Sequence, residues 1–145
     1  MTSYEKKVYL AGPMDGRTDD ECRIWRRVAA AMLQPLESLD PVRRDYRYTE
    51  VDRALAAKIV DDDKADILAS AAVLVHYDRP SVGTSMEIMF AFQHDVPVYL
   101  LNVSGTARIS PWLIHHARGR VFYDMPGACA AILQDVLGIP ARTPT

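Results

Sequence analysis

Ser81-Val82-Gly83-Thr84-Ser85-Met86-Glu87, between the aliphatic run 71–75 and the apolar run 88–92, is the stretch that decides the fold. The run 71–75 is rich in β-branched and aliphatic residues, which is typical of a buried parallel strand, and the residues around Glu87 return at helical spacing. A strand, a loop of small residues and a helix direct backbone N–H groups toward one point. Glu87 lies about one turn into that helix, so the pattern predicts a carboxylate beside an anion-binding loop.

Thr84 and Glu87 also fit a purely structural role. Thr84-x-x-Glu87 matches a capping box, in which the Thr84 hydroxyl accepts a hydrogen bond from the N3 amide and Glu87 accepts one from the Thr84 N–H. These four residues alone favour the cap, so any argument for chemistry at Glu87 depends on the rest of the chain.

Composition and charge limit the classes of function. The chain has 145 residues, 49% hydrophobic and 25% charged, which predicts a single globular domain over 1–145 with 141–145 as a frayed tail. The net charge is −2 and no basic run exceeds two residues, which argues against a nucleic-acid or membrane surface. No apolar segment approaches the roughly 20 residues that span a bilayer.

The cysteines, histidines and first residues favour a cytoplasmic protein without a metal. Cys22 and Cys129 are far apart and lack metal-type spacing, so we expect two reduced, buried thiols. His115-His116 has no third ligand nearby in the sequence and is interpreted as helix surface. The first seven residues lack the apolar region of a signal peptide.

Strand and helix patterns alternate along the chain. We expect strands at 7–11, 36–39, 72–77, 96–101 and 121–123, and helices at about 19–33, 50–69, after 81, at 111–118 and 128–137. In the first helix, the spacing of four apolar residues predicts a buried face with the arginines outside: Ile24, Val28, Ala31 and Met32. In the second helix, Ile59, Ile67 and Leu68 are expected on the buried side of the acidic run 61–63, so that one of its acids points inward. The polar and aromatic segment 42–48 is expected to be irregular.

This alternation predicts an α/β fold with a five-stranded parallel sheet covered on both faces. The architecture expected is a flavodoxin-like (Rossmann-like) three-layer sandwich with strand order 2-1-3-4-5. In that order the first and third strands are neighbours at the topological switch point, where ligands bind beyond the carboxyl ends of the strands. The loops 12–18 and 78–86 would meet there.

Three stretches resemble one family. Tyr9-Leu10-Ala11-Gly12-Pro13-Met14 is similar to the first strand and loop of the nucleoside 2-deoxyribosyltransferase superfamily. Asp63 is similar to the acidic helix motif of that superfamily, and Gly83-Thr84-Ser85-Met86-Glu87 resembles its G-x-x-x-E signature. The resemblance covers about residues 7 to 123 and implies that Glu87 is the nucleophile.

The position six residues before Glu87 implies a branch of the superfamily. Members that act on nucleosides carry an Asp there for the sugar 5′-hydroxyl, whereas this chain has Ser81. That serine resembles the members that hydrolyse nucleoside 5′-monophosphates, including 2′-deoxynucleoside 5′-phosphate N-hydrolase and CMP hydrolases. A hydroxyl and loop amides donate to a phosphate dianion that an Asp would repel. A second serine in that branch comes from the partner subunit, and Ser110 is similar in position, which implies a homodimer.

Some positions bear on substrate preference. The superfamily often has a second Asp where this chain has Ala71, and the helix after the nucleophile usually continues Leu-Gly rather than Ile88-Met89. Asp45 and the pair Arg43-Arg44 resemble the corresponding loop of the CMP-hydrolysing members. These departures from the superfamily pattern do not affect the predicted nucleophile or fold. They leave open which base and which sugar the protein prefers.

Cleavage of an N-glycosidic bond passes through an oxocarbenium-like state, which a carboxylate can stabilise and then bond covalently. Glu87 takes this role, and Asp63 supplies a proton to the leaving base if burial raises its pKa. Tyr9 either orients Glu87 through its phenol hydrogen or is an ordinary strand aromatic. No metal and no cofactor are needed.

The remaining candidates bind substrate. Backbone of the first loop would approach the sugar and base, and its residues are Gly12, Pro13, Met14, Asp15 and Gly16. Ser81, Gly83 and the partner's copy of residue 110 would hold the phosphate, while Trp112 would line the neighbouring pocket. Two other functions stay open at this point: a deoxyribosyltransferase that passes the sugar to a second base, and a nucleotide-binding module without chemistry.

Overall fold

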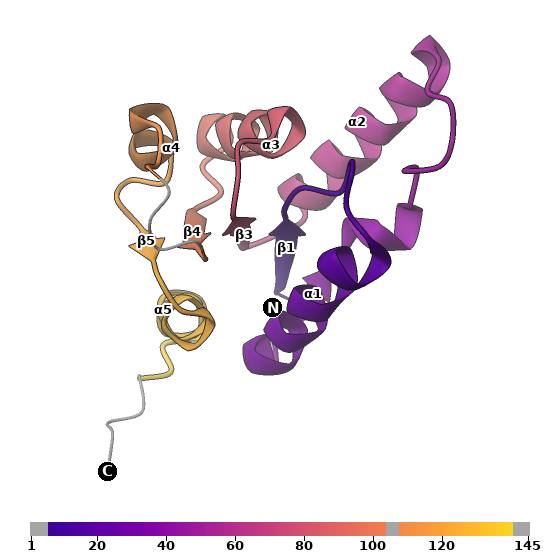
Figure 1. Ribbon diagram of the computed structural model, residues 1–145. Helices are drawn as coiled ribbons and strands as arrows, with labels where there is room; N and C mark the ends of the chain where they lie inside the picture. Colours follow the sequence, from indigo (N-terminus) through magenta and orange to yellow (C-terminus); the bar gives the residue numbers. More distant parts are fainter. Residues whose placement is uncertain (1–5, 104–107, 141–145) are drawn as a thin grey trace.

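Strands and helices alternate along the chain in the computed structural model, which describes residues 6–103 and 108–140 (Figure 1). The elements are β1 (Lys7–Ala11), α1 (Asp19–Leu33), β2 (Glu37–Leu39), the 3-10 helix η2 (Pro41–Arg44), α2 (Arg53–Leu68), β3 (Ala72–Tyr77), α3 (Val82–Gln93), β4 (Val98–Asn102), α4 (Pro111–His116), β5 (Val121–Phe122) and α5 (Met125–Leu137). The expected tail 141–145 and the first five residues lie outside the described part of the chain.

The five strands form one parallel sheet in the order β2-β1-β3-β4-β5. Tyr9 of β1 pairs in register with Val73 of β3, so these two strands are neighbours at the switch point. One face of the sheet packs against α2, α3 and α4, and the other packs against α1 and α5 (Figure 1). The predicted flavodoxin-like three-layer architecture and its strand order are therefore confirmed.

The buried face of α1 differs from the predicted one. Ile24, Val28 and Met32 are 55%, 42% and 40% exposed, so the predicted stripe was wrong. The residues that pack on the sheet are Cys22, Trp25, Ala29 and Leu33. The predicted residues and the buried residues both recur at helical spacing. The face that packs on the sheet is the one that carries the large Trp25 ring and the small Ala29.

Arg26 on α1 is buried, contrary to the expectation that the arginines of this helix lie outside. Its two terminal nitrogens donate to backbone, Nη1 to the carbonyl of Cys22 at 2.8 Å and Nη2 to the carbonyl of Gly12 at 3.2 Å, whereas Nε has no hydrogen-bond partner among the described residues. The guanidinium also lies over the Trp25 ring at 4.4 Å and has Asp40 at 3.4 Å. A buried cation is tolerated when such partners replace water.

Other boundaries differ in detail. Segment 42–48 begins in the 3-10 helix η2, which Asp40 caps, rather than being irregular throughout. Leu68 is 54% exposed, so its expected place on the buried side of α2 was wrong, whereas Ile67 is buried as predicted. Gly138 ends α5 with a left-handed φ of 71°.

Cys22 and Cys129 are free and buried, as expected. Within the ranges 6–103 and 108–140, no helix is both long and apolar enough to cross a membrane.

Candidate active site

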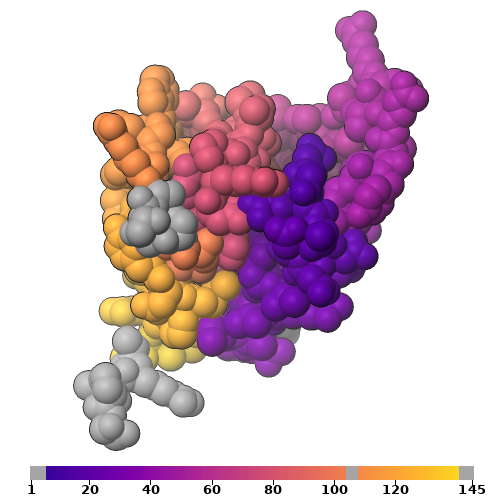
Figure 2. All heavy atoms as spheres, viewed as in Figure 1, coloured from indigo at the N-terminus to yellow at the C-terminus, as the bar shows by residue number. Residues whose placement is uncertain are grey.

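A cavity of about 730 Å³ lies where the chain leaves β1 and β3. The loop after β1, η2 with the segment that follows it, one side of α2 and the start of α3 form its walls. Figure 2 shows these parts of the chain, around residues 10–20, 40–60 and 80–90, next to one another on the surface. The two loops that the strand order predicts at the switch point both contribute, with Gly12, Pro13, Met14 and Asp15 from one and residues 79–84 from the other.

Tyr9 and Glu87 form a hydrogen-bonded pair at the floor of this cavity. Tyr9 is fully buried on β1, and its hydroxyl donates to Oε2 of Glu87. The N-cap of α3 is Ser81, whose hydroxyl accepts from the Thr84 N–H at 3.4 Å. The capping-box interpretation of Thr84 and Glu87 is therefore wrong, because Ser81 and not Thr84 caps the helix. The Glu87 carboxyl accepts from Tyr9 instead.

Asp63 of α2 lines the same cavity, and Arg44 of η2 holds it. Arg44 donates to Asp63 at 3.0 Å and to Asp66 at 2.8 Å. The three acids of the run 61–63 have different surroundings: Asp61 is exposed, Asp62 pairs with Lys58 at 2.9 Å, and Asp63 faces the cavity. One acid of the run points inward, as the sequence predicted.

Burial shifts the pKa values of both carboxyls. The pKa of Glu87 rises to about 7, mainly because the group is buried; the hydrogen bond from Tyr9 opposes this rise and the Asp63 charge adds to it. Burial likewise raises the pKa of Asp63, while the Arg44 guanidinium acts in the opposite direction. Burial and the Glu87 charge raise the pKa of Tyr9, so Tyr9 remains a hydrogen-bond donor. Glu87 is therefore only partly ionised near neutral pH, and Tyr9 holds its carboxyl in one orientation.

The loop after β1 approaches its neighbours closely at Gly12. A Cβ on Gly12 would lie 2.8 Å from Cζ2 of Trp25, so any other residue would force the loop or the buried Trp25 ring to shift. Gly16 adopts a left-handed φ of 72° and turns the chain toward α1, without lining the cavity itself. Of the five candidates in this loop, the first four line the cavity and Gly16 shapes the turn.

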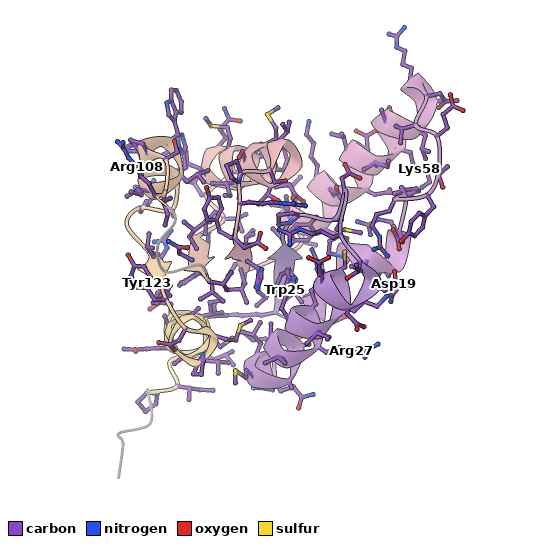
Figure 3. All side chains as sticks on the ribbon, viewed as in Figure 1. Asp19, Trp25, Arg27, Lys58, Arg108 and Tyr123 are labelled. Carbon is purple, nitrogen blue, oxygen red and sulfur yellow. The ribbon has the colours of Figure 1, made fainter. Side chains whose placement is uncertain are left out.

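Ser81 and Gly83 line the cavity at the start of α3. Ser110 and Trp112 do not line it. The Ser110 hydroxyl caps α4 by accepting from the Trp112 N–H at 3.2 Å, and Trp112 is 69% exposed. Arg108, close to the start of α4, lies on the opposite side of the molecule from Lys58 of α2 (Figure 3). Neither candidate thus contributes to the lining of the cavity of its own chain.

The chain is similar to known proteins over most of its length. The family model of nucleoside 2-deoxyribosyltransferase matches residues 8–122. The chain belongs to the nucleoside 2-deoxyribosyltransferase family. That family is one of enzymes that catalyse glycosyl transfer.

Solved structures share the fold. A conserved protein from Enterococcus faecalis V583 has a TM-score of 0.71 at 18% identity, covering 90% of this chain and 98% of its own. The 2-deoxyribosyltransferase from Bacillus psychrosaccharolyticus has a TM-score of 0.71 at 16% identity, covering 96% and 99%. A molybdenum cofactor binding protein from Rippkaea orientalis has a TM-score of 0.57 at 14% identity, covering 92% and 98%. No curated protein matches the chain in sequence.

The cavity of this family member contains arginines that were not among the predicted site residues, although Arg44 belongs to the pair that resembles a loop of the CMP-hydrolysing members. Arg44, Arg47 and Arg79 all line it. Arg44 lay in a segment that the sequence marked as cationic and aromatic, but its bond to Asp63 joins η2 to α2 and has no sequence signal. Arg79 lies two residues after the end of β3 and precedes Pro80-Ser81, so its place beyond the carboxyl end of a strand was the available signal.

Proposed function

We propose that this protein hydrolyses the N-glycosidic bond of a nucleoside 5′-monophosphate, giving a free base and ribose or deoxyribose 5-phosphate. The observation that carries the proposal is the Tyr9–Glu87 hydrogen bond beside Asp63 in one cavity. A carboxyl that caps nothing, is oriented by a buried phenol and has a raised pKa is arranged for chemistry rather than for helix stability.

The reaction divides into two displacements. In the first, a Glu87 carboxylate oxygen bonds to C1′ of the sugar while the C1′–N bond breaks, and the bonding electron pair leaves with the base. The proton of Asp63 passes to the base nitrogen or oxygen that takes up this pair. In the second, water attacks C1′, the Asp63 carboxylate accepts its proton, and Glu87 leaves as a carboxylate.

The start of α3 supports a phosphate-bearing substrate. Ser81 caps this helix, so the Val82 and Gly83 N–H groups at its first turn precede the first intrahelical bonds and are available to an anion. A phosphate there gains charge-assisted hydrogen bonds without an opposing carboxylate at residue 81. Two or three such bonds, at about 1.5–3 kcal/mol each, favour the nucleotide over the nucleoside by at least about 10²-fold.

We further propose a homodimer in which Ser110 of one subunit reaches the phosphate in the site of the other. The exposed Trp112 and the absence of α4 residues from the lining of the cavity support this arrangement. Mixing inactive Glu87→Ala subunits with inactive Ser110→Ala subunits should restore part of the activity, because one hybrid site recovers both groups. A fully active monomer in solution would contradict the composite site.

A panel of nucleotides and nucleosides, assayed for free base by chromatography, tests the function. We expect base release from a 5′-monophosphate, weak release from the matching nucleoside, and a loss of this preference in Ser81→Asp. Transfer of the sugar to an added acceptor base would identify a deoxyribosyltransferase instead. Nucleotide recovered unchanged after long incubation would identify a binding module without chemistry.

A further inference from the structure

The three arginines of the cavity differ in what their guanidinium groups contact. Arg44 pairs with three carboxylates of α2, at 2.8, 3.0 and 3.8 Å. Arg47 pairs with carboxylates before α2 and at the start of α1. Arg79 instead donates to the backbone carbonyl of Asp15 at 3.4 Å, and no carboxylate of residues 6–103 or 108–140 lies within ion-pairing distance of it. Among the described residues, Arg79 is thus the cavity arginine whose charge no acid neutralises.

Arg79 extends across the rim of the cavity. It follows β3 and lies two residues before Ser81, the N-cap of α3. Its Nη2 atom lies 3.7 Å from the point that a Cβ on Gly16 would occupy, so the side chain reaches the loop after β1. Because Gly16 has no side chain, the space beside the guanidinium is open. The cation therefore lies where the two substrate-binding loops approach each other.

We propose that Arg79 is a specificity-determining residue that binds the substrate's 5′-phosphate, an inference that rests on the proposed function. A guanidinium presents a planar fork of N–H donors that matches phosphate oxygens. The 3.4 Å bond to the Asp15 carbonyl is long, so a phosphate oxygen replaces it at little cost. Asp15 also lies on the rim, but it is exposed, and water screens its repulsion.

In this role Arg79 affects substrate binding and not the rate of bond cleavage. The phosphate does not change during the reaction, so its contact with Arg79 is equal in the ground state and the transition state. Removing such a uniform contact raises KM and leaves kcat unchanged. Because Arg79 is exposed, we expect the effect to be about tenfold, at the lower end for a charge-assisted bond.

Three variants test the proposal: Arg79→Gln, Arg79→Lys and, as a matched control, Arg27→Gln. Arg27 carries the same charge, is exposed on α1 and does not line the cavity, and no carboxylate of residues 6–103 or 108–140 pairs with it. We expect Arg79→Gln to raise KM for the monophosphate about tenfold without changing kcat or the cleavage of the nucleoside. Arg79→Lys should lose less, and Arg27→Gln should match the wild type.

Calorimetric titration with inorganic phosphate and with ribose 5-phosphate supplies a readout that needs no turnover. Arg79→Gln should weaken both by a similar factor, whereas Arg27→Gln should not. Unchanged phosphate affinity in Arg79→Gln, or an equal loss in Arg27→Gln, would overturn the assignment of Arg79. A wild-type enzyme that cleaves nucleosides as well as nucleotides would refute the proposed function instead, and the phosphate titration would still decide the role of Arg79.

Discussion

Replacement of Glu87 by Gln should make the fold more stable at alkaline pH while abolishing base release. Burial raises the pKa of Glu87 from its ordinary value of 4.5 to about 7. A group whose pKa rises on folding stabilises the folded state below its unfolded pKa, and that contribution is lost as the pH rises through the folded value. The wild type therefore loses stability from this group between about pH 4.5 and pH 8, and the Gln variant does not.

The magnitude follows from the shift. At about 1.4 kcal/mol per pKa unit, a shift of this size corresponds to on the order of 3 kcal/mol. The cavity is open to water, which reduces the cost, so we expect Glu87→Gln to gain roughly 1–3 kcal/mol over the wild type at pH 8 and nothing at pH 4.5. For a chain of this size that gain corresponds to about 3–9 °C in Tm. The Gln side-chain oxygen can still accept from Tyr9, which keeps the comparison isosteric.

Urea unfolding of the two proteins between pH 4.5 and pH 8 measures this difference directly. Glu50→Gln is the control, because Glu50 is exposed and should show no pH-dependent gain. A Glu87→Gln variant that is less stable than the wild type at every pH, or a stability difference that does not change with pH, would refute the reasoning.

Substitutions of Asp63, Tyr9 and Arg44 give further predictions. Asp63→Asn should bind nucleotide normally and slow base release by about 10²-fold or more, since an amide cannot protonate the base; equal slowing by Asp61→Asn would show that the acidic run acts only through its total charge. Tyr9→Phe removes a hydrogen bond that lowers the pKa of Glu87, so the acid limb of the pH–rate profile should move to higher pH. Arg44→Gln removes a partner that lowers the pKa of Asp63, so the alkaline limb should also move to higher pH; an unchanged profile in either variant would contradict the assigned roles.

The parallel sheet and the location of the cavity could be predicted from the sequence because they depend on local patterns. Short aliphatic runs separated by helices define the α/β order, and the crossover rules restrict the topology. Once β1 and β3 are neighbours, the loops after them must meet at one edge of the sheet. Asp63 and Glu87 reach the same cavity because α2 and α3 both pack on the face that Tyr9 points toward.

The errors concern contacts between residues far apart in the sequence. The apolar residues of α1 form two overlapping stripes, and only the sheet determines that Trp25 rather than Ile24 faces inward. Arg26 is buried because Gly12 and Cys22 offer carbonyls at the right place. The Thr84–Glu87 spacing satisfied a local rule, but α3 starts one turn earlier at Ser81, and Tyr9 supplies the partner of Glu87.

Trapping the covalent intermediate tests the central claim most directly. A nucleoside 5′-monophosphate with fluorine at the sugar 2′ position destabilises the oxocarbenium-like state, which slows release of the sugar from the enzyme. Intact-protein mass spectrometry should show one added fluorosugar phosphate, and peptide mapping should place it on Glu87. Released base without any labelled protein, or label on a residue other than Glu87, would contradict the account.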